Sequence, residues 1–200
     1  MKNVVVYVHG KGGSAEEANY YRKFFTDDFD IIGFNYKSEN PWDAKVEFSN
    51  YFDLIIPKYN KTILIANSIG AYFSLISLAD KKIKKAMLIS PIVDMERLIL
   101  DMMICENVSD EELRIKKEIG TSFGETLSWE YLSYVRKNPV HWNIPTEILY
   151  GEKDTMTSIN TITNFSKKIN AKITTMCGGE HWFHTKEQMD FLDNWIKRNI

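Results

Sequence analysis

Six short runs of β-branched and aliphatic residues recur along this chain, and helix-like stretches separate most of them. The strand-like runs cover about residues 3–9, 29–35, 62–66, 84–90, 145–150 and 171–177. The helix-like stretches cover about 14–26, 42–57, 69–81, 157–169 and 185–198. Strands that alternate with helices pair in parallel, because each crossover returns the chain to the same edge of the sheet. The pattern predicts an α/β fold: a three-layer α/β/α sandwich around a mostly parallel sheet of about six strands.

One segment, residues 92–143, interrupts this alternation between the fourth and fifth strand-like runs. A stretch of that length needs secondary structure of its own. Capping residues and helix-stop signals predict three helices there. They would run from Asp94 to Cys105, from Ser109 to Ile119 before Gly120, and from Ser128 to Lys137 before Pro139. We therefore expect one domain over residues 1–200, with a helical insertion at 92–143.

The most informative local motif is a serine between the third strand-like run and the next helix. The run ends at Ala66-Asn67, Ser68 follows, and the helix-like stretch begins at Ile69. A serine on such a tight turn exposes its hydroxyl at the carboxyl edge of a sheet. Ala66 and Gly70, two residues to either side, let the backbone bend that sharply. Alanine at the first small position departs mildly from the usual Gly-x-Ser-x-Gly pattern.

Three further motifs each follow a strand-like run. Val4 to Val8 leads into the glycine-rich segment His9 to Gly13, whose spacing fits neither a dinucleotide fingerprint nor a phosphate loop. Ile148-Leu149-Tyr150-Gly151 leads into a turn that carries Asp154. The last strand-like run leads into a loop with His181, before a helix that Thr185 and Gln188 would cap. Carboxyl ends of parallel strands share one edge, so Ser68, Asp154 and His181 are expected there together.

These motifs, in this order, resemble those of the α/β-hydrolase family over nearly the whole chain. The matching pieces are His9-Gly10, Ala66-Asn67-Ser68-Ile69-Gly70, Leu149 to Asp154, and Gly179-Glu180-His181-Trp182-Phe183. The family often has two extra antiparallel strands before the first strand seen here, so the chain resembles a trimmed version of that fold. The resemblance implies that the insertion at 92–143 is a cap over the active site.

The resemblance also implies roles for individual residues. Ser68 would be the nucleophile, Asp154 the acid and His181 the base of a serine hydrolase that cleaves a small carboxylic ester or thioester. The backbone N–H groups of Ile69 and of the Gly10-Lys11 segment would form the oxyanion hole. The chemistry needs no metal or organic cofactor. An acyltransferase or lyase on the same fold, or a non-catalytic binding protein, is the alternative.

Several assignments have competitors. Asp94 follows the fourth strand-like run and is an alternative acid, although it also fits a helix N-cap. His184 is an alternative base, and His9 is expected to shape its loop through backbone hydrogen bonds. Asn67, Trp129 and Trp182 are candidate substrate contacts. For the aromatic residues of the insertion, packing onto the core is the competing interpretation.

Composition excludes several other classes of function. The formal net charge is −2, with 44% hydrophobic and 26% charged residues, so no basic field attracts nucleic acid. No apolar window approaches the roughly 20 residues of a membrane span, and the amino terminus does not read as a signal peptide. Two cysteines, Cys105 and Cys177, favour a reducing compartment. We expect a cytoplasmic protein with a small-molecule substrate; its oligomeric state is open.

Overall fold

The computed structural model describes residues 1–200 and contains one parallel sheet of six strands. The strand order is β2-β1-β3-β4-β7-β8, and every neighbouring pair is parallel. The strands are β1 (Asn3–Val8), β2 (Phe29–Phe34), β3 (Thr62–Asn67), β4 (Lys85–Ile89), β7 (Thr146–Gly151) and β8 (Lys172–Met176). All six strands predicted from the sequence are present, with ends that differ by one residue or none, and the predicted sheet is confirmed.

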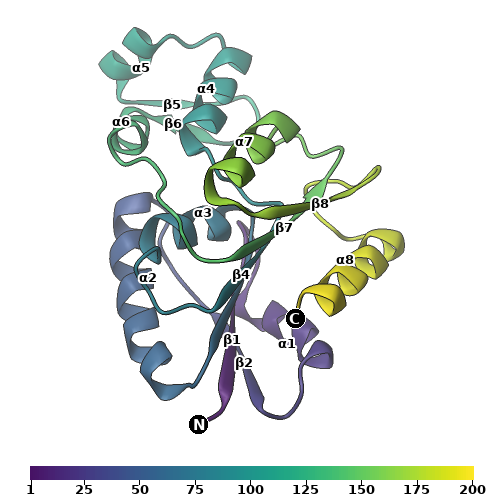
Figure 1. Cartoon of the computed structure of the whole chain (residues 1–200). Coiled ribbons are helices and arrows are strands. Elements are labelled where there is room, and N and C mark those ends of the chain that lie inside the picture. The colour runs from purple at the N-terminus through teal and green to yellow at the C-terminus, as the bar shows by residue number, and fades with distance from the viewer.

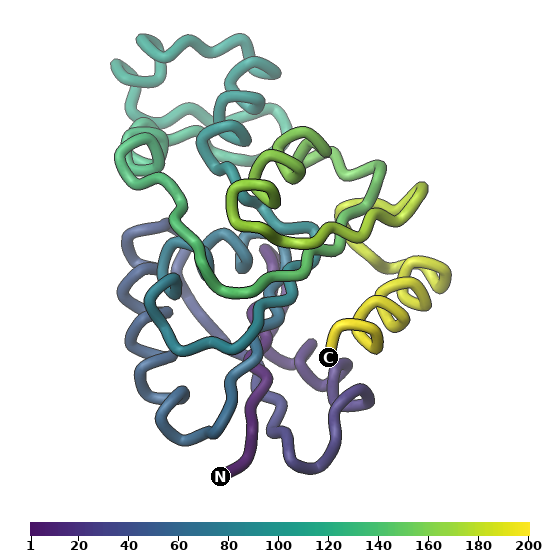
Figure 2. Tube along the Cα trace, viewed as in Figure 1, coloured from purple at the N-terminus to yellow at the C-terminus, as the bar shows by residue number.

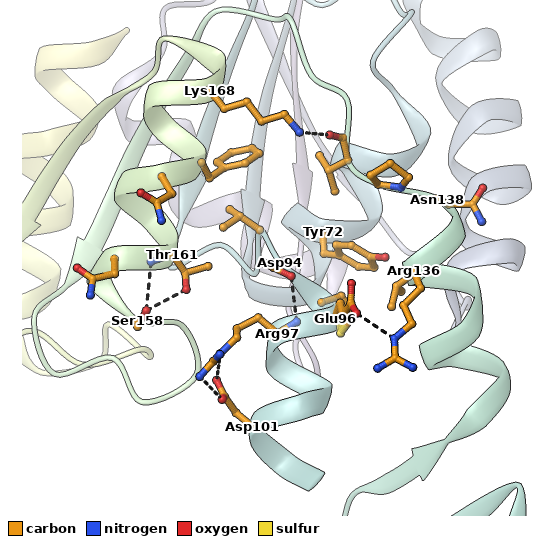
Figure 3. A pocket seen from close by; sticks show the side chains of 18 residues that line it. Tyr72, Asp94, Glu96, Arg97, Asp101, Arg136, Asn138, Ser158, Thr161 and Lys168 are labelled. Carbon is orange, nitrogen blue, oxygen red and sulfur yellow. Dashed lines mark hydrogen bonds and ion pairs between the residues drawn. The ribbon is translucent and has the colours of Figure 1, made fainter. Parts of the chain in front are cut away.

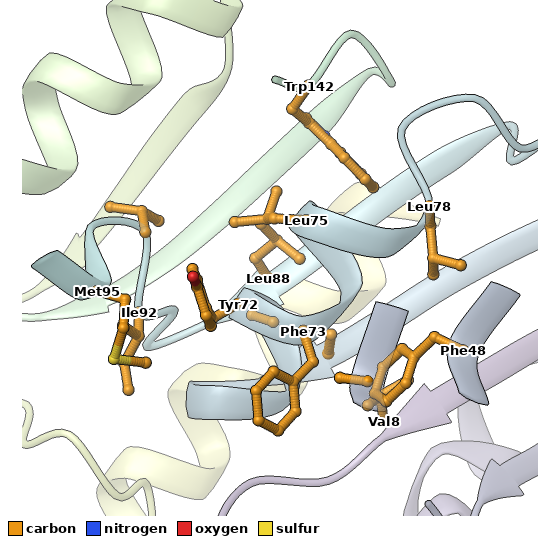
Figure 4. Close-up of a cluster of buried hydrophobic side chains, with 14 of the residues drawn as sticks. Val8, Phe48, Tyr72, Phe73, Leu75, Leu78, Leu88, Ile92, Met95 and Trp142 are labelled. Carbon is orange, nitrogen blue, oxygen red and sulfur yellow. The ribbon is translucent and has the colours of Figure 1, made fainter. Parts of the chain in front are cut away.

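Helices cover both faces of this sheet, because its strands carry apolar side chains alternately on each side. On one face, α1 (Ala18–Tyr21) and α8 (Lys186–Asn199) pack against side chains such as Val5 and Ile65. On the other face, α2 (Pro41–Ile55), α3 (Ser68–Ser77) and α7 (Ile159–Ile169) pack against side chains such as Val6 and Leu64. Figure 1 shows the resulting three layers, and Figure 4 shows part of the larger buried cluster around Phe73 and Leu88. The three-layer prediction is confirmed.

Two predicted helices differ in detail from the observed ones. Residues 14–26 form α1 between two short 3-10 turns, Ala15–Glu17 and Arg22–Phe24, instead of one continuous helix. Helix α3 stops at Ser77, four residues before its predicted end. A third 3-10 turn, Ile56–Lys58, extends α2. No helix of the chain is both long and apolar enough to cross a lipid bilayer.

The segment 92–143 projects from the carboxyl edge of the sheet (Figures 1 and 2). It contains α4 (Met95–Cys105), α5 (Asp110–Lys116) and α6 (Trp129–Lys137), close to the three predicted helices. The prediction that the second helix reaches Ile119 is wrong. That helix ends at Lys116, Lys117 takes a left-handed φ of 69°, and the hairpin β5 (Glu118–Gly120) and β6 (Thr126–Ser128) follows. Strands of three residues are too short to show alternation in a sequence.

Candidate active site

Ser68 lies on a sharp turn between β3 and α3, with a left-handed φ of 51°. The turn is possible because its neighbours are small. A Cβ on Gly70 would lie 2.2 Å from the carbonyl oxygen of His9, and a Cβ on Gly10 would lie 3.1 Å from Cβ of Ser68. Glycine at these two positions therefore lets the segment after β1 pack directly against the serine turn. A non-glycine residue with a left-handed φ has a strained backbone, and such residues occur most often at functional sites.

The hydroxyl of Ser68 lies against the imidazole of His181. Oγ of Ser68 is 2.8 Å from Nε2 of His181, which is hydrogen-bond distance. His181 follows β8 in the loop that leads to α8, so 113 residues separate the two partners along the chain. The side chain of His181 is 22% exposed, which leaves this pair accessible from solvent.

Asp154 holds the other side of the same imidazole. Nδ1 of His181 donates to Oδ2 of Asp154 at 2.7 Å, and the Asp154 side chain has no exposed surface. Its second oxygen, Oδ1, accepts the backbone N–H groups of Met156 and Thr157 at 2.8 and 3.1 Å. With the proton on Nδ1, the lone pair of Nε2 faces the hydroxyl of Ser68. The arrangement orients His181 to accept a proton from Ser68.

Close packing between two loops brings Asp154 and His181 together. A Cβ on Gly151 would lie 2.4 Å from the carbonyl oxygen of Glu180, so only glycine allows the end of β7 to approach that closely. The N–H of Lys153 donates to the carbonyl of Gly179 at 2.7 Å and joins the same two loops. The segment after β4 also contacts the site, since the N–H of Ile92 donates to the carbonyl of Ser68 at 3.2 Å.

The competing acid and base are engaged elsewhere. Asp94 caps α4 and accepts the N–H of Arg97 at 2.9 Å. His184 bonds through Nδ1 to the carbonyl of Trp182 at 2.8 Å, and the two rings stack. His9 is buried, lies with Nδ1 2.8 Å from the carbonyl of Gly10 and stacks on Tyr36, which is the loop-shaping role expected of it.

The two predicted oxyanion donors are close to Ser68 along the chain or in space: Ile69 follows it directly, and Lys11 follows Gly10, which packs against it. Ile69 is the second residue of α3, where backbone N–H groups have no partner within the helix. Lys11 lies in a turn closed by a hydrogen bond from the N–H of Gly13 to the carbonyl of Gly10 at 3.1 Å. The side chain of Lys11 binds Glu125 of the cap, with Nζ 2.6 Å from both carboxylate oxygens.

Two of the three predicted substrate contacts adjoin the Ser68–His181 pair along the chain, and the third lines a separate cavity. Asn67 is half-buried directly before Ser68 and lies beside Gly10. Trp182 follows His181 but is 69% exposed. Trp129 begins α6 and lines a cavity of about 690 Å³ within the cap that includes no residue of the Ser68–His181–Asp154 row. A second cavity, of about 720 Å³, also excludes that row.

Sequence reasoning missed the contacts that hold these side chains. The backbone donors at Met156 and Thr157 follow Asp154 within one turn, and an aspartate ahead of a turn is the signal that would have indicated them. Tyr36, whose hydroxyl donates to the carbonyl of His9 at 3.0 Å, follows β2 without any motif around it. No group of three or more His, Cys, Asp or Glu side chains is placed to hold a metal ion.

The six-stranded parallel sheet with helices on both faces agrees with solved structures of the α/β-hydrolase fold. Est1E from Butyrivibrio proteoclasticus is similar over 98% of this chain and 86% of its own, with a TM-score of 0.79 and 17% identity. Alpha/beta hydrolase domain-containing protein 10 from mouse is similar over 98% of this chain and 90% of its own, with a TM-score of 0.71 and 15% identity.

A lipase-esterase related protein from Clostridium acetobutylicum is similar over 99% of this chain and 94% of its own. Its TM-score is 0.65 and its identity 16%. No protein-family model and no curated protein matches the sequence. The chain therefore has the α/β-hydrolase fold, in a trimmed form with a six-stranded sheet.

Proposed function

We propose that this protein is a serine hydrolase that cleaves a small carboxylic ester or thioester through an acyl-enzyme intermediate. One observation carries the proposal: the continuous hydrogen-bonded row from Ser68 Oγ through His181 to the buried carboxylate of Asp154, at 2.8 and 2.7 Å. A neutral alcohol is a weak nucleophile, and an adjacent base that takes its proton overcomes that weakness.

In the acylation step, Oγ of Ser68 attacks the substrate carbonyl while Nε2 of His181 accepts the hydroxyl proton. The imidazolium that forms is stabilised by Asp154, whose position is fixed by the N–H groups of Met156 and Thr157. His181 then protonates the departing alcohol or thiol as the C–O or C–S bond breaks. The acyl group remains on Ser68 as an ester.

Negative charge develops on the carbonyl oxygen during this attack, and fixed donors stabilise it. The backbone N–H groups of Ile69 and Lys11 are the donors in our proposal, because Ile69 directly follows Ser68 and the Gly10-Lys11 segment packs against it. Loss of one such donor typically costs about 3 kcal/mol in the barrier. In the second half of the reaction, His181 takes a proton from a water molecule as that water attacks the acyl-enzyme. The bond between the acyl carbon and Oγ of Ser68 then breaks, the carboxylic acid leaves, and His181 returns the proton to Oγ.

The similar structures support a hydrolytic reaction, since one is named a lipase-esterase related protein and another an alpha/beta hydrolase domain-containing protein. Est1E was solved with ferulic acid bound, so an aromatic carboxylic acid belongs among the acyl groups to test. The half-buried position of Ser68 supports a small substrate.

A panel of p-nitrophenyl esters and acyl thioesters tests this function. Turnover of at least one member by the wild type, lost by more than a thousand-fold in Ser68→Ala, is the expected result. Ser74→Ala is the matched control, because Ser74 lies on the same helix but binds the carbonyl of Gly70. Absence of turnover for the whole panel would reject hydrolysis. Transfer of the acyl group to an added alcohol or amine in preference to water would favour the acyltransferase alternative.

A further inference from the structure

A cavity of about 720 Å³ lies between α3, α4, α6 and α7. Figure 3 shows Tyr72 in its middle, with Ser158 and Thr161 of α7 on one side and Arg136 on the other. None of Ser68, His181 and Asp154 lines it. Its volume falls within the range of small-molecule sites, which is about 300–1,000 Å³. The cavity is therefore separate from the candidate active site and large enough for a ligand.

Tyr72 is the most deeply buried polar residue of this cavity. It is only 1% exposed, and its hydroxyl makes no hydrogen bond within the chain. Burial raises the pKa of this phenol, so the hydroxyl keeps its proton and can both donate and accept. A hydroxyl in a cavity wall that has no partner within the chain is free to exchange hydrogen bonds with a ligand there.

The charged groups of the cavity wall are largely neutralised by one another. Glu96 accepts from Arg136 at 2.9 Å, and Arg97 pairs with Asp101 at 2.8 Å. Nζ of Lys168 donates to the carbonyl of Val140 at 3.2 Å. The wall thus has no cluster of free cations that would attract an anion. The three carboxylates of Asp94, Glu96 and Asp101 balance the three cations of Arg97, Arg136 and Lys168.

The polar groups left free are neutral amides. Asn160 and Asn164 lie one turn apart on α7 at the exposed rim of the cavity, and neither side chain makes a hydrogen bond within the chain. Each amide offers both donors and an acceptor. Val93, Val135 and Phe165 add apolar surface to the cavity wall. This mixture of paired donors and acceptors over a partly apolar floor matches hydroxyl groups on a carbon ring.

We propose that this cavity is a second, non-catalytic binding site for a neutral polyhydroxylated molecule, a sugar of one or two rings. The hydroxyl of Tyr72 and the amides of Asn160 and Asn164 would bind its hydroxyl groups. The cavity adjoins the candidate active site at one point along the chain. Ser158, in the cavity wall, directly follows Thr157, whose N–H binds the Asp154 carboxylate.

Isothermal titration of the Ser68→Ala protein with neutral sugars tests the site independently of any turnover. The panel comprises glucose, xylose, maltose, cellobiose and trehalose, with citrate and inorganic phosphate as the anionic arm. We expect at least one sugar to bind and neither anion to do so. Tyr72→Phe removes only the hydroxyl and should weaken binding about five-fold, as for one lost hydrogen bond. Asn164→Ala should weaken it at least as much.

Tyr51→Phe is the matched control, because Tyr51 stacks on Phe34 outside the cavity and should leave sugar affinity unchanged. A circular-dichroism spectrum establishes that each variant is folded. Failure of every sugar to bind at millimolar concentration would overturn the proposal, as would binding of the anions instead. Sugar binding that Tyr72→Phe and Asn164→Ala leave unchanged would also overturn it. None of these outcomes bears on whether Ser68 is a nucleophile.

Discussion

Ser68 and Ser90 occupy equivalent positions just past the carboxyl ends of the adjacent strands β3 and β4, and both have left-handed φ. Their φ angles are 51° and 42°, and the register pairs the residues before them, Asn67 with Ile89. The two sharp turns send the chain in different directions: one starts α3, and the other carries Ile92 back to the carbonyl of Ser68 at 3.2 Å. Strain at both turns thus helps to define the geometry around the serine hydroxyl.

This strain predicts that Ser68→Gly is more stable than Ser68→Ala. A left-handed φ costs a non-glycine residue about 1–2 kcal/mol, and the greater backbone entropy of unfolded glycine offsets part of that. We expect Ser68→Gly to exceed Ser68→Ala by about 0.5–1 kcal/mol in free energy of unfolding, with both variants inactive. Urea denaturation of the two proteins measures the difference. Equal stabilities, or a more stable alanine variant, would show that the turn is not strained.

A second prediction concerns the contact between β1 and α3. Gly70→Ala would place a Cβ 2.2 Å from the carbonyl oxygen of His9, so β1 and α3 must move apart. We expect a loss of about 2–3 kcal/mol in unfolding free energy, as for overpacking in a core. Gly120→Ala is the control, because nothing lies within 4 Å of its added Cβ. Similar effects from the two substitutions in thermal denaturation would contradict the packing described here.

The assignment of the acid gives a third prediction. Asp154→Asn should lower kcat by about a thousand-fold or more, because an amide cannot stabilise the imidazolium and favours the wrong tautomer of His181. Asp94→Asn removes the competing carboxylate, which caps α4, and should leave kcat within a few-fold of wild type. Steady-state kinetics on one activated ester compares them. A larger loss of kcat in Asp94→Asn than in Asp154→Asn would mean that Asp94, after β4, is the acid.

A fourth prediction concerns the cap and its dependence on pH. Hydrogen bonds from Arg136 hold the pKa of Asp110 below its usual value, and Arg136 also binds Glu96 at 2.9 Å. Because the folded pKa is lowered, this contribution is present above the unfolded pKa of about 3.9 and is lost as pH falls through the folded value. Both side chains of the Arg136–Asp110 pair are partly exposed, so Arg136→Gln should cost only about 0.5 kcal/mol at neutral pH.

Thermal denaturation of wild type and Arg136→Gln at pH 7 and below pH 4 measures this difference. The difference in stability between the two proteins should be smaller below pH 4 than at pH 7. A difference that grows as the pH falls would mean that Arg136 stabilises the cap through something other than these carboxylates.

Much of this architecture could be predicted from the sequence because its signals are local. Buried parallel strands such as 3–8 and 62–67 are continuous apolar runs, and Thr185 with Gln188 forms the predicted capping box. The order of Ser68, Asp154 and His181 followed from where strands end. The hairpin at Glu118–Ser128 could not be predicted, since three-residue strands carry no periodicity.

The cap's relation to the site was also beyond the sequence. Trp129 was expected to contact substrate, but its position depends on how α6 packs, and it lies in a cavity apart from Ser68. The cavity beside Tyr72 brings together residues from four separate helices and the loops that join them. No spacing along the chain indicates such a long-range arrangement. The local turn at Ser68, by contrast, was readable from five consecutive residues.

Peptide mapping after reaction with a fluorophosphonate tests the central claim most directly, namely that His181 makes the hydroxyl of Ser68 nucleophilic. In wild type, a single modified peptide should carry the label on Ser68. At the same time point, His181→Ala should carry almost none, while His184→Ala should label like wild type. Label on another residue, or equally fast labelling of Ser68 in His181→Ala, would contradict the account.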